Sequence, residues 1–204
     1  RISKLNLAIQ ESRAASPVAP ALDVVAKASI TVVPADPKVF AQQQRPSEPP
    51  QADVLRYEAA RCGCQFLHGQ VWYITAEEND FVALRAIEAG DLIAHCNVTS
   101  LPARSEGRET SLEEFEQDVR LALGDNLESV TASTEWTTKQ GYDCLGVVAR
   151  GQAEGVPIEW RYYLIAAPNR PRISLGVTIE QSNIERFDDA DRLIVESLEL
   201  VAKP

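Results

Sequence analysis

The chain has 204 residues, of which 45% are apolar, and a formal net charge of −10. Residues 59–204 carry a net −11 and residues 1–58 a net +1, so the main part of the chain repels phosphate backbones and is not expected to bind nucleic acid. No stretch approaches the ~18 apolar residues of a membrane span.

The chain begins at Arg1 and contains no methionine. We therefore expect a processed product, a trimmed chain or the tail of a longer protein, whose upstream part the sequence does not reveal. Its length allows a core to form without disulfides, which favours reduced cysteines and a cytoplasmic setting. The general character of the segment points to a bacterial protein.

The first 57 residues divide into two parts. Within residues 1–33, two stretches of alternating apolar residues, 2–10 and 22–33, predict a strand pair. Residues 34–57 are rich in proline and glutamine, which predicts a linker. Because two strands alone are marginal in water, the pair must add to another sheet or be the remnant of an upstream domain.

From about Tyr57 the alternation returns and predicts an antiparallel meander of four strands joined by short turns. Charged residues 77–80 form one turn, and Gly90 with Asp91 forms another. The strands are expected at residues 57–66, 71–76, 81–87 and 92–101.

A helix is predicted over residues 110–123. Thr110 and Glu113 have the spacing of a capping box, and Gly124 is a stop signal. Apolar residues recur along one face of this helix, at Leu112, Phe115, Val119 and either Ala122 or Leu123.

The remaining residues predict further strands and a second helix. This helix is expected over residues 183–198, capped by Ser182 with Glu185 three residues later. The final Glu199-Leu200 is expected to form a short edge strand. The preceding strands are predicted at residues 129–137, 142–151, 156–167 and 173–179.

Several segments occur in an order that resembles the PsbP-like superfamily. They are CNVTSLP, SLEEFEQDVRLALG, IEWRYYLIA, RISLGVTIEQ and ESLEL. The superfamily includes the PsbP subunit of photosystem II, a Ran-binding import factor, DcrB-type lipoproteins and chaperones of type VI secretion effectors. The resemblance covers residues 60–204 and implies an α+β fold in which helices sandwich an antiparallel sheet, used mostly for binding or assembly rather than catalysis.

The cysteines and histidines carry the only metal-ligand chemistry in the sequence. Cys62 and Cys64, at positions i and i+2 of a strand, would project the same way, whereas His95 should face away from Cys96. Inert thiols are favoured over a disulfide, and a disulfide over a zinc site, which needs four ligands. Cys144 completes the set.

Acidic clusters at residues 77–80 and 188–191 invite a calcium interpretation. The first lacks the spacing of an EF-hand loop and is interpreted as a polar hairpin turn. The second is interpreted as the start of the second helix, where acids stabilise the dipole. His68, which precedes Gly69, is expected in a solvated loop.

Aromatic residues on strands give the best candidates for contact with a partner, namely Trp72, Trp136 and Tyr163. Core packing is the competing interpretation of each. The strand over residues 156–167 carries bulky side chains on both faces, so we expect it to be central and covered on both sides.

The sequence therefore predicts an α+β domain at residues 58–204, without a recognisable catalytic, cofactor-binding or metal-ligating set. We expect a non-enzymatic binding or assembly module with an unknown protein partner and an undetermined oligomeric state. One alternative is a hydrolase or metal-dependent enzyme that uses Cys62, Cys64, His95 or the acids. Another is an accessory C-terminal domain of a larger protein.

Overall fold

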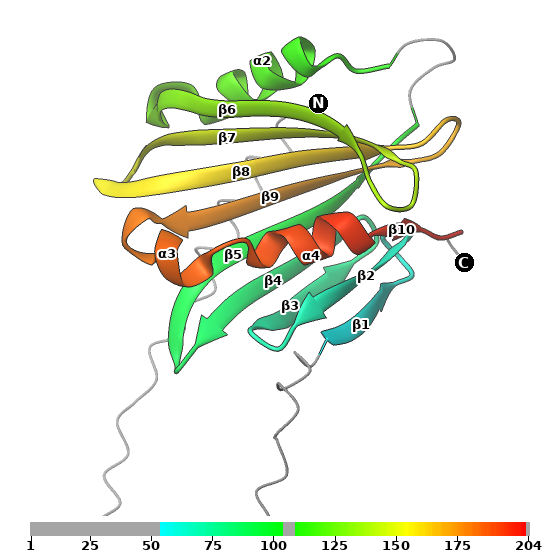
Figure 1. The fold of residues 1–204 in the computed structure, drawn as a ribbon, viewed down its shortest axis with the longest axis horizontal. Helices are drawn as coiled ribbons and strands as arrows, with labels where there is room; N and C mark the ends of the chain where they lie inside the picture. Colours follow the sequence, from blue (N-terminus) through cyan, green and yellow to red (C-terminus); the bar gives the residue numbers. More distant parts are fainter. Residues whose placement is uncertain (1–53, 104–108, 203–204) are drawn as a thin grey trace, which may run out of the picture.

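The computed structural model describes residues 54–103 and 109–202. The strand pair predicted within residues 1–33 and the linker up to residue 53 lie outside the described residues. Within the described ranges, two antiparallel sheets and helices form an α+β fold, as predicted (Figure 1).

The larger sheet has seven strands in the order β3-β4-β5-β9-β8-β7-β6. Two meanders build it, one from β3 to β5 and one from β6 to β9, and β9 pairs with β5 to join them. All neighbours in this sheet are antiparallel. The strands are β3 (Trp72–Glu78), β4 (Phe81–Glu88), β5 (Asp91–Leu101), β6 (Leu127–Thr137), β7 (Asp143–Ala153), β8 (Val156–Ala166) and β9 (Arg172–Glu180).

The smaller sheet corrects the predicted four-stranded meander. Residues 57–66 do not form one strand, because a turn that contains Gly63 at φ 78° divides them. The resulting hairpin forms a separate sheet in the order β1-β2-β10. The final two residues of this sheet are the predicted edge strand. Its members are β1 (Val54–Ala59), β2 (Cys64–Gly69) and β10 (Glu199–Leu200), so β1 begins inside the range predicted as linker.

Helix α2 (Leu112–Leu123) has its N-cap one residue later than predicted. The N-cap is Ser111, whose side chain accepts a hydrogen bond from the backbone N–H of Glu114 at 3.1 Å, so the capping box predicted from Thr110 is wrong. Gly124 ends the helix with φ 51°, as predicted.

The predicted second helix is broken. A 3₁₀ turn, η2 (Gln181–Asn183), leads into α3 (Ile184–Phe187), and α4 (Ala190–Ser197) follows separately. Between them Asp188 has φ 50° and ψ −124°, close to the φ 51° and ψ −128° of Gly124. An aspartate therefore occupies a helix-ending conformation that favours glycine, which is why the apolar periodicity did not reveal the break.

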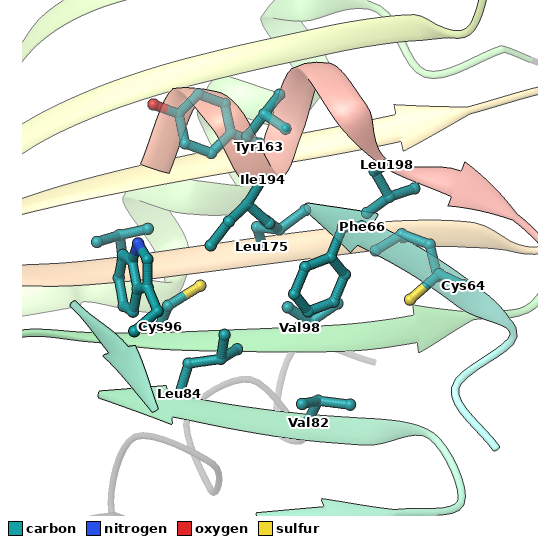
Figure 2. Close-up of a cluster of buried hydrophobic side chains, with 14 of the residues drawn as sticks. Cys64, Phe66, Val82, Leu84, Cys96, Val98, Tyr163, Leu175, Ile194 and Leu198 are labelled. Carbon is teal, nitrogen blue, oxygen red and sulfur yellow. The ribbon is translucent and has the colours of Figure 1, made fainter. Parts of the chain in front are cut away.

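Two apolar cores lie on opposite faces of the larger sheet. One joins β3, β4, β5 and β9 to α4 and the smaller sheet; Figure 2 shows Leu84, Val98 and Leu175 meeting Ile194 of α4 and Phe66 of β2. The other joins α2 to β7 and β8. Strand β8 contributes to both, because Tyr162 belongs to the α2 core and Tyr163 to the α4 core. It is central and covered on both sides, as predicted.

Candidate functional site

The two cores are offset, so each described helix layer covers only part of its face of the larger sheet. On the face that carries α4, the apolar core is built mainly on β3, β4, β5 and β9. On the same face, β6, β7 and β8 carry charged and aromatic side chains, several of which contact α4. Figure 1 shows that these three strands lie beyond β9 from β5. We call this part of the face the α4-side platform and define it by Trp136, Gly146, Arg150, Glu159 and Arg161.

A chain of ion pairs crosses the platform and enters the core. Glu159 is 3% exposed and accepts hydrogen bonds from Arg161 at 3.0 Å and from Arg150 at 2.9 Å. Arg161 Nη1 also donates to Asp191 Oδ1 at 3.1 Å and to the carbonyl of Asp188 at 3.1 Å. The guanidinium thereby ties β8 to both sides of the break between α3 and α4.

Asp191 is the most deeply buried acid of this chain of ion pairs, at 1% exposure. Its second carboxylate oxygen accepts a hydrogen bond from the hydroxyl of Tyr163 at 2.7 Å. Burial raises the pKa of Asp191, and Arg161 and Tyr163 only partly offset that effect. Burial alone would lower the pKa of Arg161, but Asp191 and Glu159 keep it above its ordinary value. Asp191 does lie in the first turn of a helix, as predicted, but it is also buried and paired with Arg161, which the sequence did not indicate.

Trp136 lies at the surface on the same face of the sheet and is held by four neighbouring residues. A methyl group placed on Gly146 would lie 2.9 Å from Cζ3 of the indole, so the ring rests on the bare backbone of β7. The guanidinium of Arg192 lies 4.8 Å from the ring centroid. The indole N–H donates to Glu196 at 2.9 Å, and Tyr163 meets the ring edge-on at 6.2 Å. The indole is thus rigidly placed yet remains partly exposed.

The three predicted contact aromatics occupy different environments. Trp72 is 2% exposed, donates from its indole N–H to the carbonyl of Ala190 and packs edge-on against Phe187. Tyr163 is 7% exposed. Both are core side chains, so Trp136 is the member of the set that has surface to offer a partner.

The predicted thiol and imidazole candidates do not come together. Cys62, Cys64 and Cys96 lie in the α4 core as buried thiols. His95 projects from the opposite face of β5, as expected from the alternation, so a shared site with the cysteines is ruled out. Burial raises the pKa of Cys96 far above its ordinary value, which disfavours the thiolate needed for nucleophilic attack or metal binding.

Other predicted residues are also placed differently from expectation. Cys62 lies in the turn before β2 rather than in a strand, although its thiol is buried. His68 is 5% exposed rather than solvated, and its Nδ1 lies 3.0 Å from the carbonyl of Gly69. Residues 77–80 lie at the turn that joins β3 to β4, as predicted. Glu77 accepts a hydrogen bond from the hydroxyl of Tyr57 at 2.6 Å.

In the described ranges, no three His, Cys, Asp or Glu side chains gather closely enough to hold a metal ion. No described helix combines the length and apolar character needed to cross a membrane.

The buried ion pairs were missed by reasoning from the sequence. The available signal was the pair Glu159 and Arg161, two charges on one face of a strand whose other positions are bulky and apolar. Two charges at the centre of a covered strand need partners. Identifying Asp191 as that partner required the three-dimensional fold.

Comparison with known proteins identifies the fold. No family model and no curated protein matches the chain. Among solved structures, it is similar to the Ran-binding protein Mog1p of Saccharomyces cerevisiae, with 8% identity, a TM-score of 0.54 and coverage of 74% of this chain and 97% of that chain. It is also similar to cyanobacterial PsbP (CyanoP) of Synechocystis, with 11% identity, a TM-score of 0.52 and coverage of 78% and 98%.

A protein from Bacteroides thetaiotaomicron matches with 8% identity and a TM-score of 0.50 over 71% of this chain. This chain spans only 47% of that protein. Similarities at these identities show the fold alone. They confirm that the chain has the α+β fold of PsbP and Mog1 that its sequence resembles.

Proposed function

We propose that this domain is a protein-binding module that assembles with another protein through the α4-side platform. The observation that carries the proposal is the rigid, partly exposed indole of Trp136, held between Gly146 and Arg192. The name of Mog1p, a Ran-binding protein, supports the use of this fold for binding other proteins.

The energetics of protein interfaces favour such a residue. Tryptophan and arginine dominate the side chains whose truncation costs most binding energy. A side chain that is already fixed before binding loses little conformational entropy in the complex. Because Trp136 is hydrogen bonded to Glu196 and stacked with Arg192, most of its ordering cost is met within the free domain.

The test is the affinity of a partner for substituted chains. Proteins retained by the immobilised chain from a lysate would be identified, and the affinity of each purified candidate measured by calorimetry. Trp136→Ala should weaken binding of the true partner by about 2 kcal/mol, roughly 30-fold in affinity. Trp136→Phe, which keeps an aromatic ring on Gly146, should weaken it less.

Leu121→Ala is the matched control, because Leu121 is 64% exposed on α2, away from the platform. Its affinity should equal that of the natural chain. A partner bound equally well by the Trp136 variants would contradict the proposed surface. Turnover that depends on one named side chain would contradict a purely binding role.

A further inference from the structure

On the face of the larger sheet that carries α2, one half has no described helix packed over it. Helix α2 packs over β7 and β8, with β6 beside them. On β3, β4, β5 and β9 the same face has no described element above it. The cross-strand register places Tyr73 beside Arg85, Arg85 beside His95, and His95 beside Thr178. We call this row, with Asn97 and Gly176 next to it, the α2-side half-face.

Arg85 stands out among the arginines of the described residues. Three of them are partly buried, Arg85, Arg161 and Arg172. Arg161 pairs with three carboxylates, and Arg172 donates to Thr110 and to the carbonyl of Pro102. No hydrogen bond or ion pair joins Arg85 to another described residue. In a chain of net charge −10, a partly buried arginine without a carboxylate requires an explanation.

The acids that share this region do not serve Arg85. Glu78 is the last residue of β3, and Glu180, the last residue of β9, lies two residues beyond Thr178; neither forms an ion pair with Arg85. Glu88 and Asp91, at the β4–β5 turn, are both paired with Arg186. The immediate cross-strand neighbours of Arg85 are instead the exposed ring of Tyr73 and the imidazole of His95.

Tyr162 provides an independent observation at the inner edge of the half-face. Its side chain is 2% exposed, and its hydroxyl has no hydrogen-bond partner. A methyl placed on Gly176 would lie 3.2 Å from Cε1 of Tyr162, so the ring leans across β9 toward β5. Gly176 is paired there with Asn97. A buried hydroxyl without a partner is destabilising, and the ring that carries this one lies over the β9 strand at the border of the uncovered row.

We propose that the α2-side half-face binds an extended acidic segment of a partner protein. A carboxylate of the segment pairs with Arg85, and an oxygen of the segment accepts a hydrogen bond from the Tyr162 hydroxyl. The row crosses four adjacent strands, a span of about 14 Å at normal strand spacing, which suits a polypeptide segment better than a small anion. Tyr73, 52% exposed, supplies an aromatic contact at its outer end. This site is separate from the α4-side platform and faces the other way.

The experiment is an NMR titration of the full chain at low salt with a short blocked peptide that alternates threonine and glutamate. Saturable shifts should appear at the amides of Arg85, His95 and Gly176. Arg85→Gln should weaken binding roughly tenfold or more, because it removes a charge-assisted contact, and Arg85→Lys should weaken it less. Tyr162→Phe should weaken it severalfold. Arg56→Gln, an exposed arginine on β1, should leave binding unchanged.

A peptide with lysine in place of glutamate should not bind. Absence of saturable shifts with the acidic peptide, or equal weakening by Arg56→Gln, overturns the proposal. Arg85→Gln without peptide provides a further check. If Arg85→Gln shifts the amide resonances of residues 1–53, the chain's own N-terminal segment occupies the half-face. If the substitution converts a dimer to a monomer in sedimentation, a second copy of the chain occupies it. Either result overturns the proposed partner.

Discussion

The α4-side platform and the α2-side half-face lie on opposite faces of one sheet and share a device, an aromatic ring resting on a strand glycine. Trp136 lies on Gly146 of β7, and Tyr162 lies on Gly176 of β9. Their charges differ. On the platform, Arg150, Glu159, Arg161 and Asp191 neutralise one another, whereas Arg85 has no partner among the described residues.

This difference separates charges that maintain the fold from a charge that is available for recognition. The ion pairs of the platform lock the break between α3 and α4 onto β8, and breaking them should destabilise the fold. Arg85 should contribute little to stability, because no hydrogen bond or ion pair within the described residues depends on its charge. Removal of a charge should therefore lower the stability of the fold on the platform and leave it almost unchanged at Arg85.

The sharpest test of this contrast is Asp191→Ala. It leaves the partly buried Arg161 without its most buried carboxylate and Tyr163 without an acceptor. We expect a loss of about 3–5 kcal/mol in the free energy of unfolding, measured by urea denaturation. Asp189 also pairs with Arg161, but the Asp189 side chain is 77% exposed. Asp189→Ala should therefore lower the free energy of unfolding by no more than about 1 kcal/mol. Equal losses would show that burial does not distinguish the two pairs.

The same contrast explains which features the sequence could predict. Apolar periodicity and turn residues are local signals. They predict the α+β class, most strand positions, the end of α2 at Gly124 and the two-sided burial of β8. The opposite orientations of His95 and Cys96 follow from the same alternation. These features need no information from distant parts of the chain.

The features that escaped prediction depend on distant partners. Asp188 takes a glycine-like conformation while its carbonyl accepts from Arg161, 27 residues away. The smaller sheet forms because β10 pairs with β2 across most of the chain. The sequence alone indicates only a helix-dipole role for Asp191, because its pairing with Arg161 of β8 depends on the fold. Of the predicted contact aromatics, burial removed Trp72 and Tyr163 from the surface and left Trp136.

The two glycines that lie under aromatic rings, Gly146 and Gly176, allow a test with a smaller expected effect. Gly146→Ala places a methyl 2.9 Å from Trp136, which is too close, so the indole must move. We expect a loss of about 1–3 kcal/mol in stability and an altered tryptophan fluorescence spectrum. Gly176→Ala meets Tyr162 at 3.2 Å, and the gain in strand propensity from removing glycine, about 0.5–1 kcal/mol, should offset much of the strain. A larger loss at Gly176 would show that Tyr162 is the more rigid ring.

The smallest expected effect concerns His95, because it depends on titration rather than on loss of a contact. Burial lowers the pKa of His95 below its ordinary value of 6.5, and the neighbouring Arg85 lowers it further. Across β4, Arg85 and then Tyr73 lie beside His95, and on β9 Glu180 lies two residues beyond Thr178, the partner of His95; of these groups, Arg85 is the one that shifts the pKa of His95. The unfolded chain therefore takes up a proton near pH 6.5 before the folded chain does, so stability is complete above that pH and falls as the pH decreases.

In denaturant unfolding at a series of pH values, the natural chain should lose stability between about pH 7.5 and 5.5 more steeply than His95→Gln, by less than 1.4 kcal/mol per pH unit. Arg85→Gln should reduce the difference, because it removes the repulsion while leaving the burial. Identical pH profiles for the natural chain and His95→Gln would mean that the imidazole is as hydrated in the folded chain as in the unfolded one. The α2-side half-face would then be open to water at its centre, and the carboxylate contact with Arg85 would form in a screened setting where it adds little affinity.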